Sequence, residues 1–427
     1  LKFRHKQHHK LNTQFIQQHS PEKNLYAFQN HLRRFGSQRQ VSLSLPFYGS
    51  WTVSQGHFGE HTHKGDWARA WDFEIMDESG KSFHGEGMLV SDYYCYDKAI
   101  LAPAGGVVEN ILDGIPDNLI GQRNLRQNWG NTIVIKHADN LYTKLSHLKE
   151  GSFQVKKGEQ VKRGQTLAKS GNSGNSPYPH LHFQVQSSQW IGSKTIHYPF
   201  SHYLLHDNKG VSLRSSGIPK INEKISGILP DSSLASAFDF TPGELIDLKV
   251  SLPGRADMII AEGSWEVKKD EYLNTWLECE ASACRAYFQK TEGMLYFTHF
   301  EGRMHSPLHY LYLAAFSLCL GPHKGLIIND QIPVNKVFHP HRMWLHDLLA
   351  PFYMYRSAIY RLSYPLLEES FAGTRAEINA QIDMFVFKEK AEQLNFSFLI
   401  QGDDPPLLRL RSKRNNWDIQ WKKRSTP

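Results

Sequence analysis

The sequence predicts a mainly β protein of two domains. Its 427 residues exceed the usual size of a single domain. From residue 41 to about residue 200, short segments of alternating apolar and polar residues are separated by glycine-rich turns, which is typical of half-buried strands. No long amphipathic helix interrupts this region. We therefore expect a predominantly antiparallel β domain, followed by a β-rich α+β domain.

The composition restricts the classes of partner. Hydrophobic residues make up 40% of the chain and charged residues 21%, which is ordinary for a globular protein. No apolar run approaches the ~20 residues of a membrane-spanning helix, so we expect no transmembrane segment in this chain. The net charge of +7 favours anionic partners such as phospholipid headgroups or wall polymers. Without an arginine-rich helix, an aromatic stacking motif or zinc-finger spacing, we expect no nucleic-acid partner.

Residues 1–40 are basic and rich in histidine, with weak helical patterning. A stretch of this kind is more often a solvated arm or linker than a folded element, and we assign it as one. The chain begins at Leu1 without a signal-peptide pattern, so we expect it to be a fragment of a longer protein.

The first domain is expected to span residues 41–205. Strand-like alternation opens it at Val41–Pro46 and returns in four further segments. A near-repeat, Val-Lys-Lys-Gly and Val-Lys-Arg-Gly, then predicts turns between short strands. The four predicted strands are Ala70–Ile75, Ile100–Ile111, Asn131–His137 and Leu141–Leu148.

A histidine pair lies near the end of this domain. In a strand, His180 and His182 would share one face while Leu181 and Phe183 share the other. Such a pair suits a metal site in which one ring binds the ion and the other handles protons. Two exposed histidines on an ordinary strand are the alternative. With 23 histidines and 4 cysteines in the chain, any metal site is expected to use nitrogen and oxygen ligands.

Further candidate groups stand upstream of the pair. The segment His61–Phe73 offers histidines and a carboxylate, Asp72, between Trp71 and Phe73. His147 lies at the end of an alternating segment. Two nitrogens and one oxygen with an open position form the usual arrangement of a catalytic zinc site.

Taken together, these segments resemble the lysostaphin-type zinc endopeptidases over about residues 43–190. Several separated motifs agree in order: Asp72-Phe73, Ala102–Val108, Ser146-His147-Leu148, the Gly158/Gly164 hairpin, and Gly171–Ser176 leading to His180–Phe183. The resemblance implies a β-sandwich built on a duplicated hybrid motif. It also implies a Zn²⁺-dependent hydrolase that uses a zinc-activated water to cleave peptide bonds in the stems or cross-links of bacterial peptidoglycan, in the periplasm or cell envelope.

Residue by residue, the resemblance implies that Asp72 and His182 are metal ligands. It implies that His147 and His180 are catalytic histidines. The first ligand should be a histidine upstream of Asp72, and we choose His63. It lies nine residues before Asp72, farther than in the family's commonest pattern, so a loop is expected between the two. His61 remains the competitor and His57 a distant third.

A second departure from the family is the insertion Met76–Tyr96. Loops of this length in a compact domain are often functional, so we expect it to wall the substrate groove.

The rest of the chain is expected to form a linker, residues 206–235, and a β-rich accessory domain, residues 236–427. The linker prediction depends on the polar runs Asp207–Gly210 and Pro230–Ser233. In the second domain, helices are predicted around residues 306–319 and 342–362. No catalytic constellation stands out beyond residue 206.

Two smaller features of the second domain stay open. Cys279 and Cys284 could close a hairpin disulfide or be two buried thiols. His339 and His341, near His346-Asp347, could bind a metal, but Pro340 breaks the strand alternation and we prefer a surface or core explanation.

Three functions are compatible with the sequence. The leading one is an active zinc endopeptidase acting on peptidoglycan peptides. The second is a catalytically silent scaffold or activator of other wall hydrolases, and the third is a carrier domain with a similar glycine hairpin. Ser20–Leu25 and Tyr296–Gly302 also resemble chains in which such a peptidase follows a bacterial urea transporter, which implies a possible membrane protein upstream. The sequence does not predict the oligomeric state.

Overall fold

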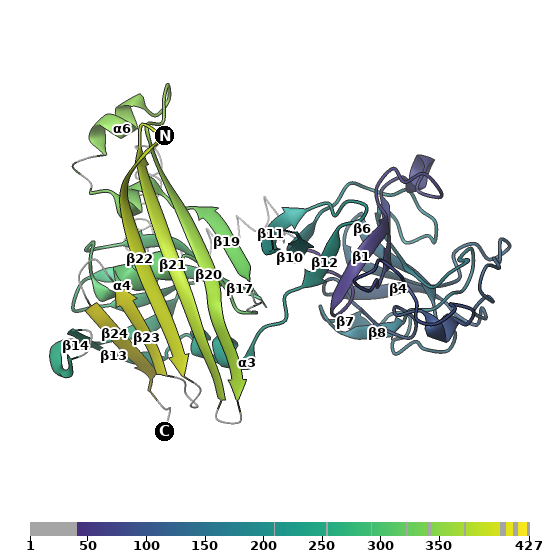
Figure 1. Ribbon diagram of the computed structural model, residues 1–427, viewed down its shortest axis with the longest axis horizontal. Helices are drawn as coiled ribbons and strands as arrows, with labels where there is room; N and C mark the ends of the chain where they lie inside the picture. The colour runs from purple at the N-terminus through teal and green to yellow at the C-terminus, as the bar shows by residue number, and fades with distance from the viewer. Residues whose placement is uncertain are drawn as a thin grey trace. The chain divides into compact units, whose positions relative to one another are not determined.

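The protein divides into two compact units, each built mainly of antiparallel strands (Figure 1). The first unit is Val41–Leu229 and the second contains Pro230–Pro427. The computed structural model describes residues 41–424, apart from 209, 253–254, 292, 322, 324, 340, 342, 371–372, 402–406 and 413–416. The predicted basic arm, residues 1–40, lies outside the described residues.

One antiparallel sheet runs through the first unit, in the order β7-β4-β5-β6-β9-β2-β1-β12-β10-β11. A separate pair, β3 and β8, forms a second small sheet. The strands are β1 Ser50–Gln55, β2 Ala70–Glu74, β3 Ala99–Leu101, β4 Gly106–Leu112, β5 Asn131–Ala138, β6 Leu141–Leu148, β7 Gln160–Val161, β8 Thr166–Lys169, β9 Leu181–Gln186, β10 Phe200–Asp207, β11 Gly210–Gly217 and β12 Lys224–Gly227. Two 3₁₀ helices, Gly65–Trp67 and Val90–Asp92, interrupt the loops.

A single apolar cluster holds the two sheets together. Trp71 and Phe73 on β2 and Phe183 on β9 belong to the same buried cluster as Ile100 on β3 and Leu167 on β8. Alternation along each strand sends the neighbouring residues to the opposite face, which leaves that face free for polar groups. The predicted mainly β, sandwich-type fold is confirmed. The predicted strand Ile100–Ile111 is in fact two strands, β3 and β4, that belong to different sheets.

The predicted linker, residues 206–235, is wrong over most of its length. Asp207 and Gly210 are register partners that close the pairing of β10 with β11, and β12 pairs with both β1 and β10. The buried indole of Trp71 also donates a hydrogen bond to the carbonyl of Pro219. Polar turn residues suit a hairpin as well as a linker, so composition alone did not separate the two.

The boundary at residue 229 leads to a prediction about the smallest folded peptidase unit. A chain of residues 41–229 should fold alone, whereas one of residues 41–205 should be insoluble or unfold at a much lower temperature. The shorter chain lacks β12 and its buried Ile225, and it uncovers Trp51, which lies opposite Ile225 in the register. Losing one buried aliphatic side chain alone costs about 2–5 kcal/mol. Thermal unfolding followed by circular dichroism measures the difference, and equal melting temperatures would contradict the boundary.

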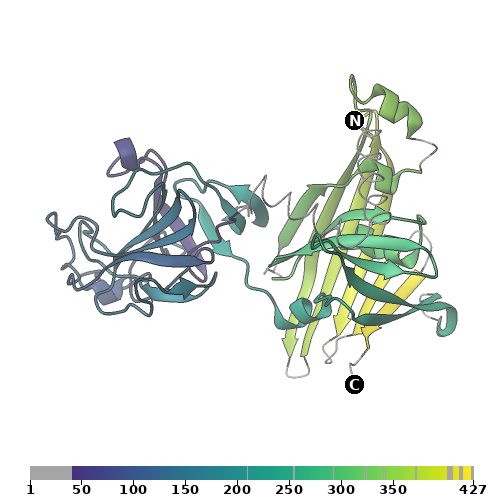
Figure 2. The ribbon, with the colours of Figure 1, turned by 180° about the vertical axis from the view of Figure 1, so that it is seen from behind.

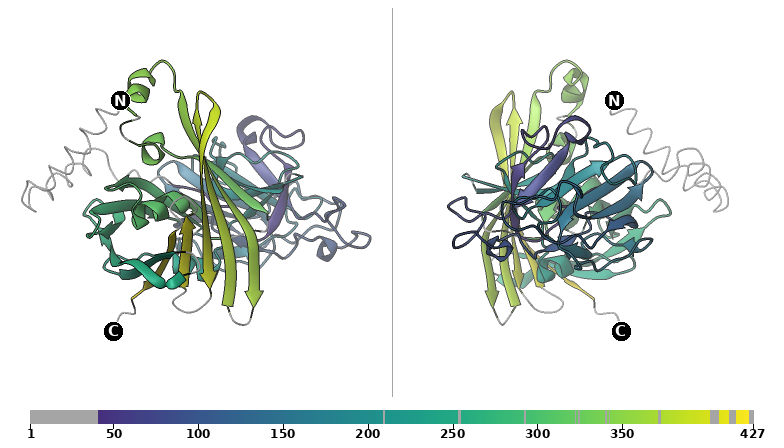
Figure 3. Two further views of the ribbon diagram at one scale, coloured as in Figure 1. Left: turned by 60° about the vertical axis from the view of Figure 1, so that its left-hand side comes forward. Right: turned by 90° about the vertical axis from the view of Figure 1, so that its right-hand side faces the viewer.

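The second unit is one continuous antiparallel sheet in the order β19-β20-β21-β22-β23-β24-β13-β14-β15-β16-β17-β18. It curves, so that β13–β17 lie across from β20–β24 (Figures 2 and 3). The strands are β13 Leu245–Leu252, β14 Arg255–Lys269, β15 Thr275–Cys279, β16 Cys284–Lys290, β17 Met294–Glu301, β18 Ser317–Cys319, β19 Leu326–Gln331, β20 Arg356–Ser370, β21 Gly373–Val386, β22 Glu389–Gln401, β23 Leu407–Ser412 and β24 Trp417–Lys423. The α-helices are α3 Ser232–Ala237, α4 Pro307–Ala314, α5 Val334–Val337 and α6 Trp344–Leu349.

Helix α4 fills the inside of this curved sheet. Ser306 caps it and Pro307 starts it, as the sequence predicts, and every residue from Leu308 to Ala314 is buried. Tyr310 touches the rings of Phe396 on β22 and Trp417 on β24. The predicted helix 306–319 is therefore too long, because Ser317–Cys319 is β18.

The second predicted helix, residues 342–362, is wrong beyond α6. Pro351 follows the end of α6, and from Arg356 the chain enters β20, which pairs with β19 and β21. Cys279 and Cys284 are register partners on β15 and β16, but all four cysteines are buried and free. None of the helices in the described part of the chain is long and apolar enough to cross a membrane.

Candidate metal centre

Two neighbouring strands bring a carboxylate and an imidazole together. Asp72 on β2 and His182 on β9 are register partners in the antiparallel pair. Both side chains are buried on the face opposite the apolar cluster. His182 Nδ1 lies 2.9 Å from Asp72 Oδ1. The alternation that sends Trp71 and Phe73 into the core therefore aims Asp72 at His182.

His63 reaches the same point from the loop between β1 and β2. Its ring is buried, and its Nδ1–H donates to the carbonyl of Gly56 at 2.8 Å. Its other nitrogen, Nε2, lies 3.3 Å from Asp72 Oδ1. The loop between His63 and Asp72 that the sequence requires is present and includes the 3₁₀ helix Gly65–Trp67.

The atoms of Asp72, His63 and His182 that point away from one another already have hydrogen-bond partners in the protein. Asp72 Oδ2 accepts a hydrogen bond of 2.7 Å from Gln55 Nε2. His182 Nε2–H donates to Gln184 Oε1 at 3.0 Å, and Gln184 Nε2 donates onward to Gln186 Oε1, so Oε1 is the accepting end of the Gln184 amide. With Nδ1–H of His63 bound to Gly56, each neutral imidazole turns its unprotonated nitrogen toward Asp72.

Three lone-pair atoms therefore face one another: His63 Nε2, Asp72 Oδ1 and His182 Nδ1. They all lie within 4.8 Å of one another. Lone pairs turned toward one another repel, and a metal ion at the centre or a proton on a ring nitrogen relieves that repulsion. Burial lowers the pKa of His63, but the charge of Asp72 and its hydrogen bond raise it overall, so His63 is the ring that takes up this proton when no metal is bound. The group therefore fits a metal ion, and among the described residues it is the only such set of three or more histidine, cysteine or acidic side chains.

The buried environment favours the metal-binding protonation states of Asp72 and His182. Burial lowers the pKa of His182 to about 4, against the opposing hydrogen bond to Asp72. Burial alone would raise the pKa of Asp72, but the neighbouring imidazoles of His63, His180 and His182 hold it well below its usual range. Ligand atoms must be deprotonated to bind a metal, so both side chains are ready to do so.

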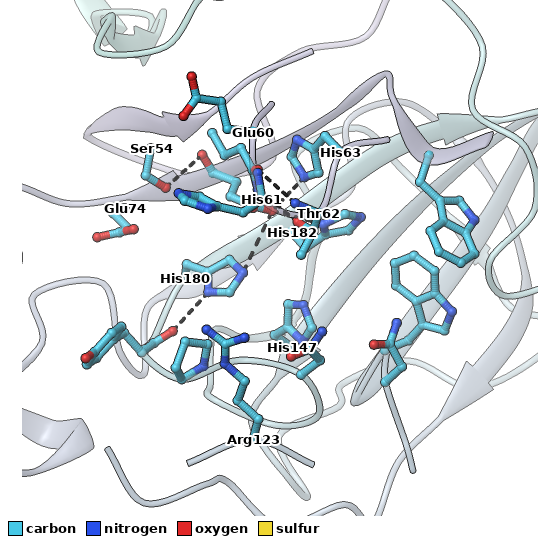
Figure 4. A pocket seen from close by; sticks show the side chains of 18 residues that line it. Ser54, Glu60, His61, Thr62, His63, Glu74, Arg123, His147, His180 and His182 are labelled. Carbon is cyan, nitrogen blue, oxygen red and sulfur yellow. Dashed lines mark hydrogen bonds and ion pairs between the residues drawn. The ribbon is translucent and has the colours of Figure 1, made fainter. Parts of the chain in front are cut away.

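Two further histidines border the group (Figure 4). His147 is the second-last residue of β6 and has a left-handed backbone, φ of 61°, which is uncommon outside glycine. Its Nδ1–H donates to the carbonyl of Ser173 at 2.7 Å, and its ring centroid lies 4.8 Å from that of His180. Burial, reinforced by His180 and His182, holds the pKa of His147 well below its usual range. His147 is therefore a neutral base at physiological pH.

His180 lies one residue before β9 rather than within it. Its Nδ1–H donates to the carbonyl of Tyr178 at 2.9 Å, and its Nε2 lies 3.8 Å from Asp72 Oδ1. Both His147 and His180 thus have Nδ1 tied to the backbone and Nε2 left for chemistry in the pocket.

These side chains line one cavity of about 810 Å³. Trp67 and Trp129 meet edge to face at 5.2 Å on one side, and the ring of Trp129 lies 5.4 Å from that of His182. Charged side chains, Glu60, Glu74 and Arg123, complete the lining. An open cavity that combines aromatic walls with charged groups suits an extended polar ligand such as a peptide.

The structure separates the competing upstream histidines. His61 lines the cavity but does not belong to the three-residue group, and its backbone N–H donates to Gln55 Oε1. His57 instead packs against Trp71, with ring centroids 4.2 Å apart. Of the three candidates, the structure brings only His63 to Asp72 and His182.

The insertion Met76–Tyr96 does not line the cavity, contrary to the prediction. The insertion instead packs against Tyr178 and Pro179, the two residues before His180. Tyr93 stacks on Tyr178 with ring centroids 6.1 Å apart, and the thiol of Cys95 contacts the carbonyl of Pro179 at 3.1 Å. The insertion therefore braces the segment that carries His180.

Sequence reasoning missed the residues that hold the ligands in place. Gln55 lies on β1, where nothing distinguishes it from other polar strand residues. Gln184 shares the face of His182 by alternation, which was the only signal available. Lys144, opposite Gln184 in the register, is fully buried with Nζ 2.8 Å from the Trp129 ring centroid. Burial holds the pKa of Lys144 well below its usual range.

The contact from Gln184 leads to a prediction about metal affinity. Gln184→Leu should weaken metal binding by about 10- to 100-fold, because His182 loses the acceptor that fixes its tautomer and ring orientation. Gln184→Glu keeps an acceptor for His182 but loses the donor to Gln186 Oε1 and Ser193 O, so it should bind metal more tightly than Gln184→Leu and less tightly than the unaltered protein. Competition with a coloured chelator measures both variants. Unchanged affinity in Gln184→Leu would show that the contact does not orient His182.

Comparison with known proteins supports one family for part of the chain. Residues 92–193 match the model of peptidase family M23. The matched segment contains His147, His180 and His182 but begins after His63 and Asp72.

Curated relatives match over short segments. The peptidoglycan DD-endopeptidase ShyA of Vibrio cholerae is 43% identical over 56 residues, 13% of this chain and 13% of that protein. The cell division protein DipM of Caulobacter vibrioides is 34% identical over 95 residues, 22% of this chain and 15% of that protein. The matches thus cover a small part of the relatives' own length.

Among solved structures, the catalytic domain of the prophage-encoded M23 protein EnpA from Enterococcus faecalis is 19% identical. The alignment covers 36% of this chain and 92% of that domain, with a TM-score of 0.25.

Proposed function

We propose that the first unit, whose residues 92–193 match peptidase family M23, is a zinc-dependent endopeptidase that hydrolyses peptide bonds in the stems or cross-links of bacterial peptidoglycan. The observation that carries the proposal is the group of His63 Nε2, Asp72 Oδ1 and His182 Nδ1, three lone-pair atoms turned toward one point. Two nitrogens and one oxygen form the ligand set of many catalytic zinc sites.

Zinc would be held by His63, Asp72 and His182. When bound, it would polarise the scissile carbonyl and make a water molecule acidic enough to act as a nucleophile near neutral pH. The hydrogen bond that Gln55 donates to Asp72 and the one that Gln184 accepts from His182 keep two of the ligands in orientation without help from the substrate.

His147 and His180 would carry the proton transfers. Each has its Nδ1–H bound to a backbone carbonyl, so each presents Nε2 to the cavity. A neutral imidazole in that position can accept a proton from the attacking water and return it to the leaving amine nitrogen. In its protonated form the same ring can stabilise the oxyanion.

The chemistry of the cavity and the matched relatives support a peptidoglycan peptide as substrate. The cavity offers the carboxylates of Glu60 and Glu74, the guanidinium of Arg123 and two indoles, which together suit a peptide carrying both charges. ShyA is named a peptidoglycan DD-endopeptidase, and this similarity supports the proposal that the protein acts in a bacterial periplasm or cell envelope.

Digestion of defined, cross-linked muropeptides by the full chain tests the proposal. Mass spectrometry of the products should show one hydrolysed peptide bond, and the activity should disappear with a chelator and return with Zn²⁺. A zinc-loaded protein that leaves every muropeptide intact would instead support the alternative, a silent scaffold or activator of other wall hydrolases. The complete ligand set favours the enzyme.

A further inference from the structure

The second unit carries an apolar surface at helix α6 and the turn that follows it. Phe352 is 89% exposed, Met354 73% and Trp344 68%. We call the whole surface the apolar tip; it consists of the exposed side chains Trp344, Leu348, Phe352, Tyr353, Met354 and Phe387. Single exposed apolar residues are ordinary, but a contiguous group of this kind usually marks a site of interaction.

The exposure is a consequence of an ordered local structure. Met343, which precedes α6, and His346, within it, are both buried, and the ring of Tyr355 stacks on Phe387 with centroids 5.0 Å apart. The backbone N–H groups of Phe352 and Tyr353 both donate to the carbonyl of Leu349. Helix α6 therefore buries one side and is fixed with its large apolar side chains turned to solvent.

The tip also projects. Helix α6 lies beyond the ends of the long strands β20, β21 and β22 (Figures 1 and 3). Phe387 comes from the turn between β21 and β22, so the helix and the hairpin end together present apolar side chains at one end of the unit. A projecting surface of this shape can enter a lipid layer, whereas a peptide ligand is usually bound in a groove.

From these observations we propose that the apolar tip inserts into the interfacial layer of a lipid bilayer. Tryptophan, tyrosine, phenylalanine and leucine at the end of a structured element are the side chains that partition into this layer. A standard protein interface uses about 20–30 residues per partner, so a tip of six side chains is small for a stable dimer.

Charge is compatible with a membrane surface. Arg356 lies over the rings of Phe338 and Tyr355, and Lys388 is exposed next to Phe387. Asp347 and Glu389 are also exposed here, so local charges largely balance and apolar insertion is the main source of affinity. The chain's net charge of +7 adds a preference for anionic headgroups.

This inference is independent of the proposed peptidase activity, and vesicle binding tests it directly. The full chain is sedimented with vesicles of phosphatidylcholine alone and of phosphatidylcholine with phosphatidylglycerol. We expect binding to both, tighter to the anionic vesicles. Leu348→Ser and Phe352→Ser should each lower the partition coefficient by about tenfold, because each removes apolar surface from the lipid.

Leu273→Ser is the matched control, since Leu273 in the turn between β14 and β15 is 71% exposed and Leu348 is 64% exposed. It should bind vesicles like the unaltered protein, and circular dichroism should show all three variants folded. Absence of vesicle binding, or equal binding by the tip variants, overturns the proposal. So does self-association in solution that the tip substitutions abolish without any vesicle binding, because the tip would then bind a second copy.

Discussion

Replacing His182 with alanine should abolish metal binding and peptidase activity together. Among the described residues, the imidazole supplies one of the three atoms of the proposed ligand set, and its loss leaves that set incomplete. Asp72→Ala should have the same effect, because Asp72 Oδ1 is the atom to which both ring nitrogens are directed. Elemental analysis of the purified proteins measures the metal, and muropeptide digestion measures the activity. A full complement of zinc in His182→Ala would mean that the site is misassigned.

His63 and His61 provide a matched pair for the same test. Both side chains line the cavity, but only His63 belongs to the three-residue group. His63→Ala should lose metal and activity, whereas His61→Ala should keep the metal and most of the activity. The opposite result would show that the loop between β1 and β2 is shifted by two residues in the working enzyme.

The second large effect is expected at His147. His147→Ala should retain zinc yet lower kcat by about 10²- to 10⁴-fold, because the ring borders the metal position without belonging to the ligand group and would act in proton transfer. Metal content and turnover, measured on the same preparation, separate the two roles. A loss of zinc equal to that of His182→Ala would instead place His147 among the ligands.

His137 offers the control for that substitution. Like His147, it contacts a backbone carbonyl through Nδ1, here that of Gly105, but it lies outside the cavity. His137→Ala should therefore leave both zinc content and kcat close to those of the unaltered protein.

Much of the candidate site was predictable because strand alternation determines it. Asp72 lies between two aromatic core residues, and His182 lies between Leu181 and Phe183. Both side chains therefore face away from the core once the strands form. His63 lies on a loop, so its choice depended on family resemblance, and periodicity could not exclude His61. Gln55 escaped notice because its contact with Asp72 joins two strands in a register that no local pattern specifies.

The errors in the fold have a common physical origin. Asp207–Gly210 has the composition of a linker and of a hairpin turn, and only the pairing of β12 with β1 distinguishes them. Residues beyond Pro351 are apolar enough for a helix, but pairing with β19 and β21 makes them strand β20. Local sequence predicts which residues are buried and where the chain turns. Long-range strand pairing decides between a linker and a hairpin, or a helix and a strand, when their local preferences are similar.

The most direct test is the anomalous scattering of zinc in crystals of the full chain. Difference maps from data collected on both sides of the zinc absorption edge should place one strong peak in the first unit. We predict that the peak lies between His63 Nε2, Asp72 Oδ1 and His182 Nδ1, at the ~2.0–2.2 Å distances of zinc ligands. A zinc-replete crystal with no peak there, or with a peak coordinated by His61 or His147 in place of His63, would contradict the account.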